Sequence, residues 1–197
     1  MSTTAKEKLG KESSCDDVMC RLDSLRSEET ILSMKRFGIN VDHAYGIQVK
    51  MLRMLAKEIG KNHVLAFELW RTGVHEARRL ATMIDDPKLV TSKQMECWVR
   101  EFDSWDVCDG CCNNLFVKTP FAYGKAIDWS LQDSLFVKRA GFVLMASLAI
   151  HDKAAKKSAF TQFIRIADAN ADEHRNLVKK AIRWALKEIR RRNLPEQ

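Results

Sequence analysis

Proline, glycine and long apolar runs are scarce in this sequence. Its 197 residues include only 3 Pro and 8 Gly, which is few for a protein built of many short strands and tight turns. The longest apolar run, residues 141–150, is too short to span a bilayer. No apolar segment of the signal-peptide type follows the start of the chain. We therefore expect a soluble, intracellular protein of the cytoplasm, associated with the nucleoid if the cell is prokaryotic, and no contact with a membrane.

The sequence also lacks the common signatures of metal and cofactor sites. It has no glycine-rich loop of the kind that binds phosphate, and its 5 His are scattered without an HxxxH pair. Cys108 and Cys111 form a CxxC, but no second CxxC or histidine pair completes a set of four zinc ligands. We expect no metal and no cofactor. We interpret the 6 Cys as reduced thiols, and Cys108 and Cys111 as small, buried residues of a helix.

Apolar residues that recur every three or four positions indicate helices. Residues 49–59 and 135–148 show this pattern most clearly. With 46% hydrophobic residues, the chain can bury one substantial core. We expect an all-α fold, with a flexible polar arm at residues 1–14 and a single domain at residues 15–194. The predicted helices cover residues 15–26, 28–37, 47–60, 62–72, 75–85, 91–102, 104–118, 120–131, 134–151, 155–168 and 172–192.

Positive charge is concentrated in the last third of the chain. The net charge is +7, yet residues 138–192 alone hold 14 Lys and Arg against 5 Asp and Glu. Several of these cations recur three or four residues apart and so share a helix face. A solvated surface helix with a basic last turn is the simpler explanation, whereas a phosphate-binding face is the functional one. The candidate DNA-binding residues are Lys138, Arg139, Lys179, Lys180, Arg183, Lys187 and Arg190.

Trp105 and Asp109 are four residues apart, so a helix places an indole and a carboxylate on one face. Arg139 follows Trp105 after 34 residues, and Trp184 follows Arg139 after 45. These intervals bracket the length of a two-helix HEAT repeat. Equivalent helices of successive repeats would then present these residues along one concave surface.

The ordered set of motifs resembles the AlkD-like family of alkylpurine DNA glycosylases, and the resemblance covers most of the chain. The matching pieces are Tyr45-Gly46-Ile47, Glu68-Leu69-Trp70, Trp105 with Asp109, Lys138-Arg139-Ala140 and Lys180-Ala181-Ile182-Arg183-Trp184. The resemblance implies a HEAT-like helical-repeat solenoid with a concave basic face. It also implies a monofunctional glycosylase that removes cationic alkylated purines, N3-alkyladenine and N7-alkylguanine, from double-stranded DNA in base excision repair. We expect a monomer.

The same resemblance assigns roles to individual residues. It places the catalytic carboxylate at Asp109, the aromatic rings that contact the sugar at Trp105 and Trp184, and an arginine that binds the DNA backbone at Arg139. Such a site is sparse, but a cationic purine is already a good leaving group. Stabilising the oxocarbenium character of the sugar and positioning a water are the remaining tasks, and one carboxylate can perform both.

Two other functions remain open from the sequence. A non-catalytic protein of the same architecture would bind damaged or structured nucleic acid, and a helical-repeat scaffold for a protein partner would show an exposed apolar groove.

Several residues also have structural explanations. Trp105 could pack in the core, Asp109 could have only a surface role, and Arg139 could pair with an acidic neighbour. Trp70, Trp98 and Trp129 follow the apolar periodicity and are predicted to pack in the core. Asp106 is predicted to stabilise a helix start, as the third residue after an N-cap at Asp103.

Overall fold

The computed structural model describes residues 8–193, which form helices and turns and no strand. This confirms the expected all-α fold. The described chain divides into two compact units, with the boundary between Leu89 and Val90. The single domain expected over residues 15–194 stays a prediction. Within residues 8–193, no helix is both long and apolar enough to cross a membrane.

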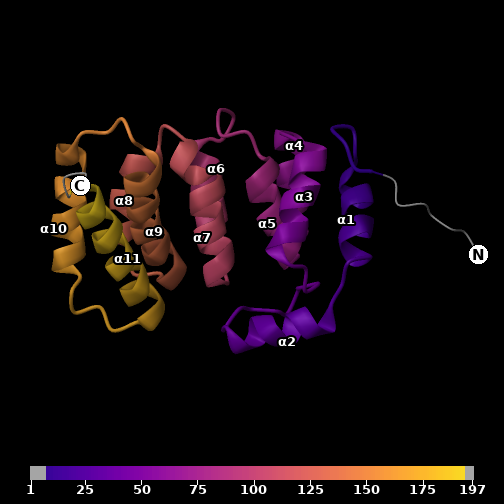
Figure 1. Ribbon diagram of the computed structural model, residues 1–197, viewed down its shortest axis with the longest axis horizontal. Helices are drawn as coiled ribbons and strands as arrows, with labels where there is room; N and C mark the ends of the chain where they lie inside the picture. The colour runs from indigo at the N-terminus through magenta and orange to yellow at the C-terminus, as the bar shows by residue number, and fades with distance from the viewer. Residues whose placement is uncertain (1–7, 194–197) are drawn as a thin grey trace, which may run out of the picture. The chain divides into compact units, whose positions relative to one another are not determined.

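Residues 8–89 of the first unit form five helices (Figure 1). They are α1 (Cys15–Asp23), α2 (Glu28–Arg36), α3 (Val49–Ile59), α4 (His63–Arg71) and α5 (His75–Ile84). Side-chain caps fix several of their starts. The Ser14 hydroxyl accepts a hydrogen bond from the backbone N–H of Asp17, whose carboxylate in turn accepts from the N–H of Ser14. This reciprocal capping box satisfies two amides that a helix end leaves without partners.

A buried carboxylate organises the loop before α3. Glu76 is fully buried on α5, and its two carboxylate oxygens accept hydrogen bonds from the backbone N–H groups of Tyr45, Gly46 and Ile47, at 2.8, 2.7 and 3.1 Å. Gly46 has a φ of +76°, and a Cβ at this position would overlap the backbone of Ser27. Only glycine fits this conformation without strain. The Tyr45-Gly46-Ile47 motif is therefore explained by packing and hydrogen bonding within this unit.

Part of the predicted N-terminal arm contacts the first unit. Residues 1–7 lie outside the described residues. Leu9 is 7% exposed, and the carbonyl of Lys11 accepts a hydrogen bond from the Asn62 side chain. Residues 8–14, which composition assigned to a flexible arm, thus pack against helices and end in the cap of α1.

The second unit contains the remaining helices (Figure 1). They are α6 (Ser92–Arg100), α7 (Trp105–Asn114), the 3₁₀ turn η1 (Phe116–Lys118), α8 (Ala122–Ser130), α9 (Leu135–His151), the 3₁₀ turn η2 (Lys157–Phe160), α10 (Thr161–Ala169) and α11 (Asn176–Asn193).

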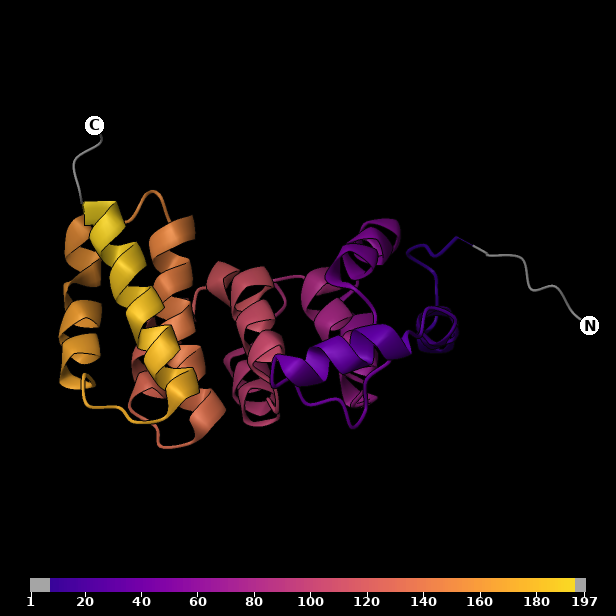
Figure 2. The ribbon, with the colours of Figure 1, turned by 60° about the horizontal axis from the view of Figure 1, so that its bottom comes forward.

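Helix α9 is the central element of this unit. It packs against α6, α7, α8 and α11, and α11 lies along it in both views (Figure 1, Figure 2). Its side chains from Arg139 to Ala149 are all buried, in agreement with a sequence that is apolar on every face. Gly141 allows α8 to approach closely, since a Cβ there would overlap the backbone of Ser130. Arg139 is the one charged residue buried on α9.

The predicted helix over residues 104–118 is wrong at its end. Helix α7 ends at Asn114, and Leu115 leaves the helical conformation with φ −124° and ψ −65°. Phe116 then turns into the core, where its ring lies 5.8 Å from that of Trp129 and 6.5 Å from that of Trp98, measured between centroids. This aromatic packing outweighs continuation of the helix. Trp70, Trp98 and Trp129 are each 2% exposed, which confirms their predicted place in the core.

Candidate active site

The centre of the candidate site is an ion pair between α7 and α9. The Nε–H of Arg139 donates to one carboxylate oxygen of Asp109 at 2.8 Å, and an Nη2–H donates to the other at 2.7 Å. Both oxygens are therefore held by the planar fork of one guanidinium, which fixes the orientation of the carboxylate. The Asp109 side chain is 21% exposed and the Arg139 side chain 7%. The Asp109 side chain is thus partly exposed, while its partner is buried.

Arg139 also contacts the third helix of the site. Its Nη1–H donates to the backbone carbonyl of Leu177, in the first turn of α11. One guanidinium thus joins α7, its own helix α9 and α11. Each of the three guanidinium nitrogens therefore donates a hydrogen bond to a group of the protein. The Arg139 side chain points into the protein interior. Its predicted contact with a DNA phosphate stays a prediction.

Burial and charge act on the Asp109 carboxyl in opposite directions. Desolvation raises its pKa, the Arg139 hydrogen bonds and positive charge lower it, and the negative charge of Asp106 raises it. The net result is a pKa above the ordinary value, because burial is the largest effect. A carboxylate with a raised pKa is a stronger proton acceptor than an ordinary aspartate, which suits a group that would activate water.

Small thiols allow α7 to approach α9 closely enough for this pair to form. Cys108 and Cys112 are fully buried, and their Sγ atoms lie 3.7 and 3.8 Å from the α9 carbonyl oxygens of Phe136 and Ala140. Burial raises the pKa of both thiols, so they stay protonated and can donate weak hydrogen bonds to these carbonyls. All 6 cysteines are free. The interpretation of Cys108 and Cys111 as buried helix residues is confirmed.

The two candidate aromatic residues lie on the helices that flank α9. Trp105 is the first residue of α7, one turn before Asp109, and Trp184 lies on α11, two turns after Leu177. Both indoles are partly exposed, whereas the other three tryptophans are buried. Seven residues are close to two full turns of an α-helix, so Trp184 lies on the same side of α11 as Leu177. The structure therefore places all four predicted site residues in the second unit, on three adjoining helices.

Helix α7 begins one residue later than predicted. Its N-cap is Ser104, not Asp103, so Asp106 is the second residue after the cap and not the third. Asp106 nevertheless lies in the acidic first turn, where a carboxylate interacts favourably with the helix dipole.

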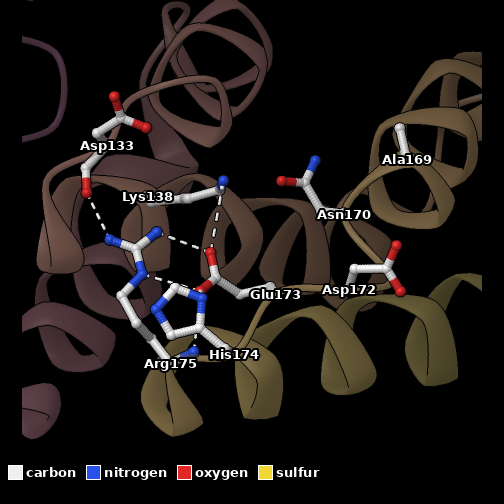
Figure 3. Close-up of a pocket in the computed structure, with 8 residues that line it drawn as sticks. All are labelled: Asp133, Lys138, Ala169, Asn170, Asp172, Glu173, His174 and Arg175. Carbon is white, nitrogen blue, oxygen red and sulfur yellow. Dashed lines mark hydrogen bonds and ion pairs between the residues drawn. The ribbon is translucent and has the colours of Figure 1, made fainter.

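The predicted DNA-binding cations have different environments. Lys138 is 14% exposed and lies 3.5 Å from the carboxylate of Glu173, within an open pocket of about 460 Å³ (Figure 3). Lys179 is partly buried on α11. The remaining predicted cations are exposed on that helix: Lys180, Arg183, Lys187 and Arg190.

Sequence reasoning missed Glu173, which pairs with Lys138, and Arg175, which pairs with Glu173. Both residues lie just before α11, and no periodic pattern marks them. Arg192 is one of the basic residues counted over residues 138–192. Its guanidinium donates to the carbonyls of Ala149, Lys153 and Ala155 and lies 4.8 Å from the Phe160 ring. The described residues contain no group of three or more His, Cys, Asp or Glu placed to hold a metal ion.

Comparison with known proteins identifies the class of this helical array. A solved structure described as "A new family of proteins related to the HEAT-like repeat DNA glycosylases with affinity for branched DNA structures" superposes with a TM-score of 0.80. The two sequences are 21% identical, and the match covers 90% of this chain and 76% of the other. The fold is thus that of the HEAT-like repeat DNA glycosylases and the proteins related to them. No curated protein matches the sequence.

The sequence itself identifies the family. Residues 18–197 match the family described as DNA alkylation repair enzyme, and the chain belongs to this family. The resemblance that the motifs indicated is therefore confirmed, as is the HEAT-like all-α fold.

Proposed function

We propose that this protein is a monofunctional DNA glycosylase that hydrolyses the N-glycosidic bond of cationic alkylated purines, N3-alkyladenine and N7-alkylguanine, in double-stranded DNA. The observation that supports this most is the Asp109 carboxylate, which is held at both oxygens by Arg139 and is still 21% exposed. A carboxylate that is fixed in orientation on a partly exposed side chain is suited to face a reacting sugar.

The proposed reaction uses the charge of the lesion. An alkylated purine carries a positive charge and leaves as a neutral base, so no residue has to protonate it. As the bond from C1′ to the base breaks, the deoxyribose gains oxocarbenium character. Asp109 stabilises this charge and accepts a proton from the water that attacks C1′. The products are the free base and an abasic site.

Trp105 and Trp184 supply the aromatic faces of the site in this proposal. An indole face attracts a cation, with each contact contributing about 0.5–2 kcal/mol. Both rings are partly exposed and lie on the helices on either side of Arg139. We assign them to contacts with the cationic sugar or the alkylated base.

Arg139 is a positioning residue in this proposal. It holds the Asp109 carboxylate in one orientation and supplies the positive charge that favours its ionised form. The phosphate contacts come instead from exposed cations of α11. Lys180 and Lys187 are the nearest of them to Trp184 in helical register, at four residues before and three residues after it.

Release of a base from alkylated DNA tests this function. The purified protein is incubated with a duplex that carries one N7-methylguanine, and the free base is measured by chromatography together with alkali-labile abasic sites. Release of N7-methylguanine in equal amount to the abasic sites supports the proposal. Binding of the duplex with no released base and no abasic site contradicts it.

A non-catalytic protein that binds structured nucleic acid is the second candidate. The structural neighbour is described as having affinity for branched DNA structures, and that description favours the same property here. A four-way junction bound more tightly than a duplex of the same length, without base release, would favour this second function. For the glycosylase we further propose that it acts in base excision repair as a monomer in the cytoplasm or nucleoid.

A further inference from the structure

Three charged residues meet in the pocket beside the start of α9. Glu173 is 5% exposed at its side chain, and Arg175 donates to it through Nε at 2.8 Å, Nη2 at 2.7 Å and its own backbone N–H at 2.9 Å. Lys138 approaches the same carboxylate at 3.5 Å. Figure 3 shows these three side chains turned toward one another, with Arg175 reaching on to the carbonyl of Asp133.

This arrangement resembles an anion-binding site in which a carboxylate of the protein itself takes the place of the bound anion. A lysine and an arginine converge as they would on a phosphate, but a carboxylate of the same chain occupies the position between them. The surrounding charges lower the pKa of Glu173 well below its usual range, with the Arg175 hydrogen bonds as the largest cause. This lowered pKa favours the ionised form of Glu173, which can pair with both cations.

The position of the pocket relates it to the candidate active site. Lys138 directly precedes Arg139, and Arg175 lies two residues before Leu177, whose carbonyl Arg139 contacts. Without Glu173, both cations would add to the positive surface next to the site. We propose that the ion pairs with Glu173 keep Lys138 and Arg175 from binding the DNA backbone. Glu173 thereby limits the extent of the phosphate-binding surface and the affinity for undamaged DNA.

This inference depends on the DNA-binding part of the proposed function but not on base excision. It also changes the role expected for Lys138, which the sequence placed among the DNA-binding residues. With Lys138 and Arg175 held by Glu173, the phosphate contacts fall to exposed cations of α11 such as Lys180.

Binding of an undamaged duplex at several salt concentrations tests the proposal. Glu173→Gln removes the resident charge and frees both cations. We expect affinity to rise about three- to tenfold near 0.1 M salt, and the plot of log K against log salt to steepen by about 1–2, since each added phosphate contact contributes about 0.9. Asp172→Asn is the matched control, because Asp172 is exposed, lines the same pocket and carries the same charge. It should change affinity less than twofold.

A second pair of variants covers the case in which Glu173→Gln loosens the loop before α11. In the otherwise unchanged protein, Lys138→Gln should change the DNA affinity less than about twofold. It should change the slope of log K against log salt by less than about 0.3. Lys180→Gln should lower the slope by about 0.9. Equal losses of DNA affinity and salt slope in Lys138→Gln and Lys180→Gln would overturn the proposal. Equal gains of affinity in Glu173→Gln and Asp172→Asn would also overturn it. If the variants show these changes in DNA binding but the protein releases no base, only the glycosylase function is contradicted.

Discussion

Asp109 and Arg139 are separated by 30 positions in the sequence and meet through two hydrogen bonds that pair both carboxylate oxygens with one guanidinium. The arginine is the more deeply buried partner, and it also contacts α11 through the Leu177 carbonyl. A carboxylate in such a contact is fixed before a substrate arrives. Preorganisation of this kind is the main way in which a protein stabilises developing charge.

Replacement of Asp109 by Asn should separate catalysis from binding. The amide keeps the size of the carboxylate but not the charge that faces the oxocarbenium ion. Base excision should fall by about 10² to 10³, whereas DNA affinity should stay level or rise, because a negative charge near phosphates is removed. The measurements are single-turnover release of N7-methylguanine and duplex affinity.

The melting temperature of this variant is not decisive, because loss of the Asp109 charge also weakens the contact with Arg139. Excision is therefore compared per folded molecule. Asp128→Asn, an exposed carboxylate of α8, is the control for the change in charge. Unchanged excision per folded Asp109→Asn protein would show that Asp109 has a structural role alone.

Arg139→Lys should shift the pH dependence of excision. The reaction needs ionised Asp109, so the rate should fall as the pH drops through a pKa that burial raises above 3.8. Lysine cannot reproduce the two parallel hydrogen bonds, which lower this pKa. The acidic limb of the pH–rate profile should therefore move to higher pH in Arg139→Lys. A limb that stays in place would mean that Arg139 does not control the ionisation of Asp109.

The ionisation of Asp109 should also make the free energy of unfolding depend on pH. Since the folded-state pKa of Asp109 is raised, the ionised carboxylate is less favourable in the folded than in the unfolded protein. Its contribution to the free energy of unfolding should be largest below the unfolded pKa and decrease as the pH rises through the folded pKa. Asp109→Asn should remove this part of the pH dependence, which urea unfolding at several pH values can measure.

Neutral lesions should not be substrates. Uracil and hypoxanthine are poor leaving groups without protonation, and the site that we propose contains a carboxylate, a paired arginine and two indoles but no assigned general acid. Duplexes with either lesion should give no free base under conditions that release N7-methylguanine. Robust release of uracil would show that the proposed chemistry is wrong.

DNA binding should weaken steeply as the salt concentration rises. Two sets of cations on α11 should contribute unequally to the slope of log K against log salt. Lys180, Lys187 and Arg191 share the Trp184 side of the helix, whereas Arg183 and Arg190 lie on the next ridge. Replacing Lys180 and Lys187 together by Gln should lower the salt slope by nearly 2. The same change at Arg183 and Arg190 removes equal charge and should lower it less. A plot that is flat in the unchanged protein would contradict DNA binding through phosphates.

Glu76→Gln should destabilise the first unit. The carboxylate accepts hydrogen bonds from three backbone N–H groups, and a neutral amide can match these contacts only in part. Hydrogen bonds to charged groups contribute about 1.5–3 kcal/mol each, so a loss of about 2–4 kcal/mol in the free energy of unfolding is expected. Glu12→Gln, at an exposed position, should change it by less than about 0.5 kcal/mol. Equal unfolding midpoints for both variants would mean that Glu76 does not anchor the loop.

The sequence was sufficient to predict most of the helices. The helix expected over residues 155–168 begins only at Thr161, after the turn η2, and the helix expected over residues 172–192 begins at Asn176. The apolar periodicity at residues 49–59 matches α3, and the same periodicity at residues 135–148 lies within α9. Trp105 with Asp109, Arg139 and Trp184 were placed on the helices where the structure has them. These properties depend on local periodicity, and that information is contained in neighbouring residues.

Only the tertiary structure decided which charged groups meet. The partners of Arg139 are 30 and 38 positions away. Lys138 on α9 likewise meets Glu173, which lies in the loop before α11. Lys138 and Arg139 look equivalent in a count of basic residues, but each has a different anionic partner. The end of α7 was decided in the same way, by the packing of Phe116 among core rings. Periodicity fixes the face of a helix on which a side chain lies, whereas the atom that it contacts depends on how close the neighbouring helices pack.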